Sequence, residues 1–162
     1  MGQFSQYLNY SIEVVSNRSD EKRGIGFLIA TKDKKINGSQ GFHGLSENEK
    51  RWFQTAFDWY VGNHINKKRH HGWDKSEFNG LYNRCYVFKA EHNRLYGFLC
   101  NPKTGDQSFQ FCVIVAHAAK RQLKTEVSFL QIAEECRNNL LVQKAVKLLF
   151  SNTIKGNNNG KR

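Results

Sequence analysis

Apolar positions are densest between residues 109 and 116, where an almost unbroken run predicts a strand buried on both faces. Two β-forming segments precede it at residues 81–89 and 94–100, and the short turn between them favours an antiparallel pair. A loop of turn-forming residues, 101–106, leads into the buried segment. The pattern therefore predicts a three-strand antiparallel meander in the second half of the chain.

Helical spacing of apolar residues marks two further regions. Residues 45–65 open with a capping box formed by Ser46 and Glu49, and aromatic and aliphatic residues then recur every three or four positions. Thr125 is a candidate N-cap for a second helix, which is expected to break or bend near Asn138 and Asn139 before its apolar stripe continues. The first of these helices is expected to cover the sheet with its aromatic face.

The N-terminal part of the chain predicts two more strands. Residues 7–16 are rich in β-forming residues, and residues 26–31 form a second short apolar segment that can pair with the first as a hairpin. Residues 32–44 are polar and predict a loop. The chain is therefore expected to form one α+β domain over residues 1–155, followed by a disordered tail at 156–162.

Composition adds a preference for negatively charged partners. The 162 residues carry a formal net charge of +11, which favours RNA, DNA, the ribosome or an acidic protein. No signal peptide and no run of about 20 apolar residues is present, so we expect a cytoplasmic protein without a membrane partner. Four cysteines stand apart in apolar segments and are expected to be reduced core residues, namely Cys85, Cys100, Cys112 and Cys136.

A run of basic residues follows the first long helix, and it has two interpretations. Cations at a helix C-terminus are stabilised by the helix dipole, which makes a purely structural role sufficient. Alternatively, so many donors form a surface that binds phosphate. A metal site is not expected, because adjacent histidines on a regular element point apart and no third ligand has a useful spacing. The run comprises Lys67, Lys68, Arg69, His70 and His71.

The order of these elements and three short segments resemble the RelE/HigB-type toxins of bacterial toxin–antitoxin systems. Residues 120–126 (KRQLKTE), with Ala133 further on, are similar to the K-K-T-x-K-T-P segment and the following helical alanine of the phage-derived branch. Gln122 and Glu126 replace the usual threonine and proline of that segment. The other two segments are 80–84 (GLYNR), which resembles a glycine-leucine-aromatic-Glu-x-Arg pattern, and 93–96 (NRLY), which resembles an arginine-containing strand.

The resemblance implies a RelE-like α+β fold, with an antiparallel sheet and an N-terminal extension at residues 1–45. It also implies a metal-independent endoribonuclease that needs no cofactor and cuts mRNA, usually on the ribosome, by directing a 2′-hydroxyl at the adjacent phosphate. An acidic antitoxin protein would be its partner. The catalytic residues implied are Arg84, Arg94, Tyr96, His117 and Lys120, and the RNA-binding residues are Arg121 and Lys124, to which the basic run adds Lys67, Lys68 and Arg69.

Other interpretations of the same residues stay open. His117 at a strand end can be a structural hydrogen-bonding residue, Arg94 a solvated edge residue, and Tyr96 a core residue. The whole basic face can equally belong to a non-catalytic RNA- or DNA-binding module, or to a protein-interaction module on the same fold. Growth arrest on expression would favour the toxin.

Overall fold

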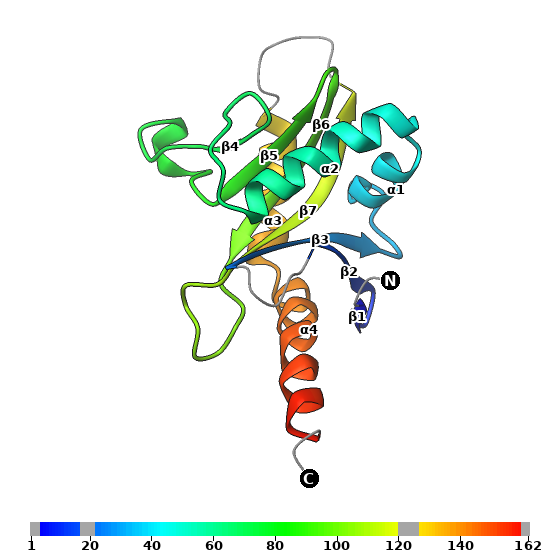
Figure 1. Cartoon of the computed structure of the whole chain (residues 1–162), viewed down its shortest axis with the longest axis vertical. Coiled ribbons are helices and arrows are strands. Elements are labelled where there is room, and N and C mark those ends of the chain that lie inside the picture. The colour runs from blue at the N-terminus through cyan, green and yellow to red at the C-terminus, as the bar shows by residue number, and fades with distance from the viewer. Residues whose placement is uncertain (1–3, 17–21, 120–126, 160–162) are drawn as a thin grey trace.

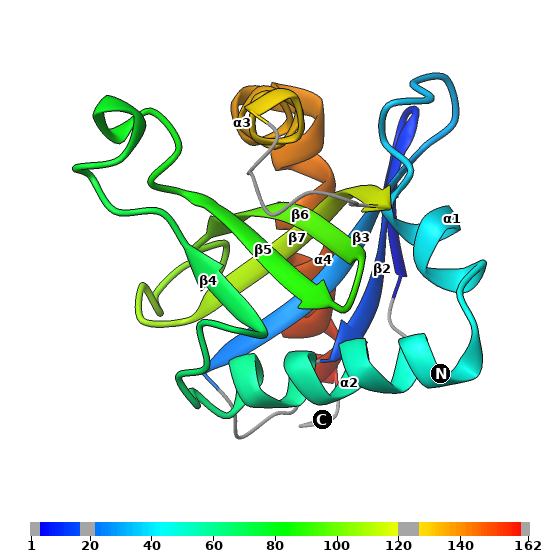
Figure 2. The ribbon, with the colours of Figure 1, turned by 90° about the horizontal axis from the view of Figure 1, so that it is seen from above.

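The computed structural model describes residues 4–16, 22–119 and 127–159. A seven-stranded sheet forms its centre, with α-helices against both faces (Figures 1 and 2). The strands are β1 (Phe4–Tyr7), β2 (Tyr10–Ser16), β3 (Arg23–Ala30), β4 (His70–Gly72), β5 (Cys85–Ala90), β6 (Asn93–Cys100) and β7 (Gln110–Ala119). The helices are α1 (Gly38–His43), α2 (Glu47–Val61), α3 (Val127–Asn138) and α4 (Leu140–Asn159), and a short 3₁₀ turn, η1, spans Phe78–Gly80.

The strands lie in the order β1-β2-β3-β7-β6-β5-β4. Neighbouring strands are antiparallel except β3 and β7, which run parallel with Arg23 opposite Gln110 and Phe27 opposite Ile114. The expectation of an antiparallel sheet is therefore wrong for this one pair, and the sheet is mixed. The predicted meander is confirmed as β5, β6 and β7, and the α+β class is confirmed as well.

Three elements were not expected from the sequence. The segment 7–16 is divided by a tight turn in which Leu8 has a φ of 54°, so that its first part joins β1 and the rest forms β2. Residues 32–44 were expected to be a loop, but they contain α1. β4 is only three residues long, too short for a hydrophobic pattern to mark it.

The basic run does not end α2, which corrects one sequence expectation. α2 stops at Val61, where the N–H of Gly62 donates to the carbonyl of Asp58 and Asn63 takes a left-handed φ of 60°. The next residues turn back toward the sheet, and His70 pairs with Phe88 in β4. The cations therefore belong to the connection between α2 and β4, beside the edge of the sheet.

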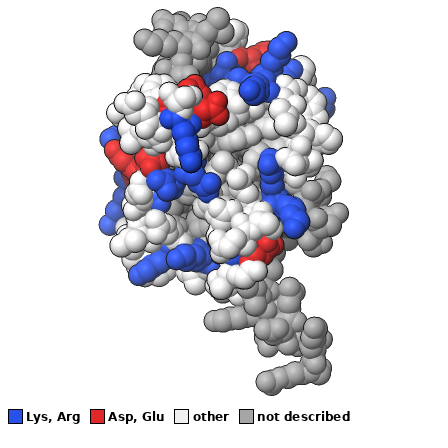
Figure 3. Space-filling view, turned by 90° about the vertical axis from the view of Figure 1, so that its left-hand side faces the viewer, with Lys and Arg blue, Asp and Glu red and all other residues white. Residues whose placement is uncertain are grey.

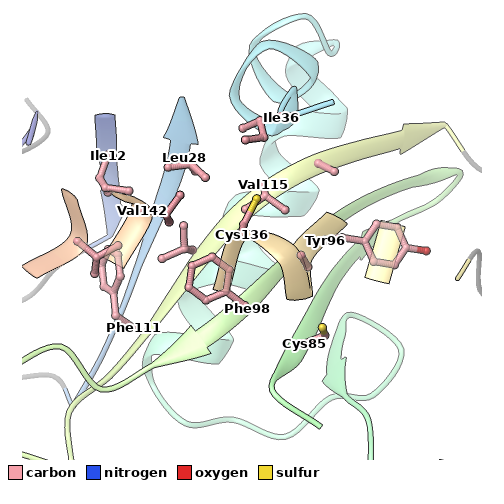
Figure 4. Packing of buried hydrophobic residues seen from close by; sticks show 14 of the residues in the cluster. Ile12, Leu28, Ile36, Cys85, Tyr96, Phe98, Phe111, Val115, Cys136 and Val142 are labelled. Atoms are coloured by element: carbon pink, nitrogen blue, oxygen red, sulfur yellow. The ribbon is translucent and has the colours of Figure 1, made fainter. Parts of the chain in front are cut away.

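The two faces of the sheet carry separate hydrophobic clusters. α1 and α2 cover one face, where Phe42, Phe53 and Phe57 pack with residues of β3 and β7. α3 and α4 cover the other face, where Val142 lies among side chains of β2, β3 and β6 (Figure 4). The cysteines contribute to these clusters: Cys85, Cys112 and Cys136 are buried and Cys100 is half-buried, and all four are free thiols.

The expected break in the C-terminal helical region is confirmed at Asn139, between α3 and α4. Its side-chain oxygen accepts from the N–H of Leu141 at 2.9 Å and so caps the start of α4. Within the described ranges, none of the helices is long and apolar enough to cross a membrane. Residues 156–159 of the expected disordered tail are the last residues of α4, and residues 160–162 lie outside the described residues.

Candidate functional site

Two adjacent hollows lie at the β4 edge of the sheet, with volumes of about 590 and 430 Å³, and both are lined by Asn66 and Lys89. We call them together the β4-edge groove. Figure 3 views this side of the molecule and shows Lys and Arg side chains spread around a hollowed surface. Among the described residues, six basic and three acidic ones line the groove: Arg23, Lys67, Lys68, Arg69, Lys89 and Arg94 against Asp74, Glu77 and Glu91.

Strand register brings three of its polar side chains together. His71 in β4 pairs with Val87 in β5, and Lys89, two residues further along β5, is on the same face and pairs with Arg94 in β6. This is the face that α3 covers, because Val87 and Tyr96 both belong to the α3–α4 cluster. An imidazole and two cations therefore share one end of the sheet.

The hydrogen bond of His71 determines its tautomer. Its Nδ1 lies 2.8 Å from the carbonyl oxygen of Gly72, and a carbonyl only accepts, so Nδ1 carries the proton. Burial lowers the pKa of His71, and the charges of Lys89 and Arg94 lower it further, against the opposing effects of the bond to Gly72 and the charge of Glu77. The neutral imidazole then has an unprotonated Nε2, which has no hydrogen-bond partner among the described residues. This nitrogen can accept a proton at neutral pH.

Arg94 is held by the β5–β6 turn. Its Nη1 donates to the carbonyl of Glu91 at 2.6 Å and to that of Asn93 at 2.9 Å. Burial lowers the pKa of its guanidinium, but an arginine remains charged in proteins. The main chain of β5 is bonded to the basic turn, since the N–H of Lys89 donates to the carbonyl of Arg69 at 2.7 Å. Hydrogen bonds thus hold the three segments that carry Arg69, Lys89 and Arg94.

His70 faces the opposite way and has a structural role. It is 5% exposed, its Nε2 donates to the carbonyl of His64 at 2.8 Å, and its Nδ1 is 2.6 Å from the hydroxyl of Tyr86. With Nε2 protonated, the neutral ring accepts from the tyrosine hydroxyl. Burial lowers the pKa of His70, so the folded protein prefers the neutral form.

This preference predicts that acid destabilises the protein. The pKa of His70 in the folded protein lies below the ordinary histidine value of about 6.5, so the unfolded chain binds the proton more readily. The stabilisation is complete above pH ~6.5 and is lost as pH falls through the folded pKa. We expect the free energy of unfolding in urea to fall from pH 7.5 to pH 5, and to fall less in His70→Gln. An equal fall in both proteins would show that His70 is not responsible.

His117 lies on the other face from Arg94. It pairs with Leu95, which belongs to the α1–α2 cluster, and its Nε2 is 2.7 Å from the side-chain oxygen of Asn93. Asn93 in turn donates to Glu49 at the start of α2. Burial lowers the pKa of His117. The structure therefore places this histidine in a network that joins α2 to the sheet, and does not bring it to the groove.

Two other residues expected at the site are also placed away from it. Arg84 precedes β5 and donates to the carbonyl of Leu99 and the side chain of Asn101, five residues along the strand from Lys89, which is about 16 Å. Tyr96 is 2% exposed and its ring stacks on that of Phe129 at 5.3 Å. Tyr96 is thus a core residue beneath the groove.

Of the remaining expected residues, three line the groove and three cannot be placed. The side chains of Lys67, Lys68 and Arg69 come from the turn before β4. Lys120, Arg121 and Lys124 lie outside the described residues. Ala119, the last described residue before them, pairs with Asn93 next to Arg94.

His71 and Lys89 were not expected to share a site with Arg94. His71 was considered as a metal ligand, a cation or a phosphate donor within the basic run, and Lys89 only as the end of a strand. The available signal was the alternation of β5, which puts Lys89 on the face of Val87. Without the pairing of β4 with β5, that alternation does not indicate which residue of the basic run lies beside Lys89.

Comparison with known proteins returned no match, since no family model, curated protein or solved structure is significantly similar to this chain.

Proposed function

We propose that this protein is an endoribonuclease that cuts single-stranded RNA in the β4-edge groove, and that it is the toxin of a toxin–antitoxin pair with a RelE-like arrangement. The observation that carries the proposal is the placement of His71, Lys89 and Arg94 on one face of the sheet, within a groove of six basic residues. A neutral imidazole beside two fixed cations has the groups that RNA cleavage requires.

The proposed reaction uses the 2′-hydroxyl of the RNA as the nucleophile. Nε2 of His71 takes the proton of that hydroxyl, and the 2′-oxygen attacks the adjacent phosphorus. Arg94 and Lys89 bind the non-bridging phosphate oxygens, whose negative charge grows in the transition state. The bond from phosphorus to the 5′-oxygen breaks, and in the proposed reaction the ammonium of Lys89 gives a proton to the leaving oxygen. The products are a 2′,3′-cyclic phosphate and a 5′-hydroxyl.

The basic turn supplies phosphate contacts on one side of the reacting group. Lys67 and Lys68 are exposed and line the groove with Asn66, whose side chain accepts from the N–H of Lys68 at 3.2 Å. Ammonium groups in this position neutralise the phosphates of the flanking nucleotides and carry no base specificity.

Replacing Lys67 and Lys68 together by glutamine is expected to weaken RNA binding and its dependence on salt. The slope of log affinity against log salt concentration should become shallower by roughly 0.7 for each phosphate of the single strand that is no longer neutralised. Fluorescence anisotropy across a salt series measures it. The control is Lys32→Gln/Lys34→Gln, which removes the same charge from exposed residues outside the groove. Equal slopes for the two double variants would place the RNA elsewhere.

Controlled expression in bacteria tests the cellular part of the proposal. We expect growth arrest and new mRNA 5′ ends, detected by primer extension, with the wild-type protein, and neither with a folded Lys89→Ala/Arg94→Ala variant. Normal growth with intact mRNA, while the wild-type protein is soluble and folded, would contradict the toxin.

The second candidate is a non-catalytic RNA-binding module, and the dense positive charge of the groove favours it equally. It differs from the nuclease in one measurable respect. Substituting His71 would leave RNA intact in both the variant and the wild type, and only affinity would respond to removal of the cations.

A further inference from the structure

Two tryptophans of α2 lie outside both hydrophobic clusters, Trp52 exposed and Trp59 half-buried. The inward side of α2 consists of Phe53, Ala56, Phe57, Tyr60 and Val61, all of them buried. Trp52 and Trp59 are seven residues apart, about two helical turns, and so lie on nearly the same side of the helix, at the border of this inward face. Trp52 is 40% exposed, which is unusual for the side chain that gains most from burial.

Arg69 connects both tryptophans with the β4-edge groove. Its guanidinium carbon lies over the ring of Trp52, 3.9 Å from the ring centroid. Arg69 and Trp59 line the smaller hollow of the groove together with Lys68, Lys89 and Arg94. Arg69 therefore links the Trp52 ring to the hollow in which Trp59 lies with the cations proposed to bind the scissile phosphate.

This sequence of groups has the chemistry of a single-strand track. Unpaired bases stack on aromatic rings and on arginine planes, while neighbouring cations hold the phosphates. A duplex hides the faces of its bases and offers only phosphates to such a surface. A protein partner would not need ring faces next to phosphate-binding cations, so the charge and the rings together favour a nucleic acid.

We infer that Trp59 and the Trp52–Arg69 pair form a stacking track that binds unpaired RNA bases next to the β4-edge groove and restricts the substrate to single strands. The inference rests on the proposed function in that the bound RNA continues from the track into the proposed cleavage site. Binding to the track does not itself require cleavage. The track offers one base platform on Trp59, inside the hollow that Lys89 and Arg94 line, and a second on the Trp52–Arg69 pair.

The test uses a fluorescein-labelled 2′-O-methyl oligonucleotide of about ten nucleotides, a length within the usual range of single-strand sites. This probe has no 2′-hydroxyl, so it reports binding without reaction. Trp59→Ala is expected to lower its affinity roughly 5- to 150-fold, the range that corresponds to removal of one stacked base. Trp59→Phe should recover most of the affinity, and Gln54→Ala, an exposed residue of the same helix, should bind like the wild type.

Trp52→Ala provides the second variant, because an exposed side chain can be removed without unfolding the protein. It should also bind the single strand more weakly, whereas the affinity for a blunt 2′-O-methyl duplex should be the same for both alanine variants and the wild type. Unchanged single-strand affinity in the folded variants, or a duplex bound as tightly as the single strand, would overturn the track.

The two proposals fail in different ways. If the wild type binds the probe through Trp59 but leaves ordinary RNA intact, the stacking track is supported and the endoribonuclease proposal is wrong. If the wild type cuts RNA but Trp59→Ala and Trp52→Ala bind the probe as the wild type does, the endoribonuclease is supported and the stacking track is wrong.

Discussion

Replacing His71 by alanine is expected to lower the rate of RNA cleavage about 10²- to 10⁴-fold, the usual contribution of a general base. The reason is that Nε2 of His71 is the proposed proton acceptor beside Lys89 and Arg94, while Nδ1 donates to the carbonyl of Gly72. Single-turnover cleavage of a labelled RNA measures this rate. RNA affinity should change little, because a neutral imidazole contributes no charge to phosphate binding.

The pH profile adds a signature that a structural histidine would not produce. Cleavage by the wild type should fall on the acid side as His71 becomes protonated, at a pH below the ordinary histidine pKa of about 6.5, because burial lowers the pKa of this group. The variant should lack this acid limb. His92→Ala, which removes an exposed imidazole from the β5–β6 turn, is the matched control. A folded His71→Ala protein that cuts at the wild-type rate would remove His71 from the mechanism.

Gly97→Ala is expected to destabilise the fold by at least ~2 kcal/mol, which is at the upper part of the range for overpacked sites. A methyl group at Gly97 would overlap the carbonyl oxygen of Val113 on the neighbouring strand, and a backbone atom cannot turn away as a side chain does. The register of β6 on β7 shifts between Tyr96 and Gly97, which is the position of a β-bulge. Relief of the overlap would disturb the strand that carries Arg94.

Urea unfolding compares this variant with Gly44→Ala. At Gly44 an added methyl group would have its nearest neighbour, the carbonyl oxygen of Gln40, at 3.4 Å, an ordinary contact, so this control should change stability by less than about 0.5 kcal/mol. Similar stabilities for the two variants would mean that β6 and β7 separate easily at the bulge.

Local signals were sufficient for the elements that depend on neighbouring residues. Ser46 and Glu49 predicted the start of α2, and the N–H of Glu49 does donate to the hydroxyl of Ser46 at 3.2 Å. The short turn after residue 90 predicted the pairing of β5 and β6, and Asn139 marks the predicted break between α3 and α4. Such features depend on residues a few positions apart, so the local sequence is sufficient to predict them.

The site depends on contacts between distant residues, which explains why it was predicted only in part. Arg94 and the turn at Lys67 to Arg69 were expected to be functional and do line the groove. His71 lies beside them only because the chain leaves α2 at Gly62 and returns to the sheet edge as β4. A strand of three residues is too short to produce a periodic hydrophobic pattern, so β4 was not predicted. His117 was selected for its position at a strand end, but the register of β7 on β6 turns it toward Asn93 and α2.

The parallel pairing of β3 with β7 is the other long-range feature. Both strands are apolar on both faces, as expected for strands covered by helices on two sides, but apolar content does not specify a neighbour. Arg23 and Gln110 are more than 80 positions apart, and α1, α2 and the strands β4 to β6 separate them in the sequence, so no local pattern indicates that they pair.

The most direct test of the central claim is cleavage of a 5′-labelled unstructured RNA by the purified protein in EDTA, with and without ribosomes, followed by analysis of the product ends. The account predicts fragments with a 2′,3′-cyclic phosphate and a 5′-hydroxyl from the wild type and from Lys32→Gln/Lys34→Gln, and none from a folded Lys89→Ala/Arg94→Ala variant. Intact RNA in both wild-type reactions, or equal cleavage by the Lys89→Ala/Arg94→Ala protein, would contradict a catalytic site in the β4-edge groove.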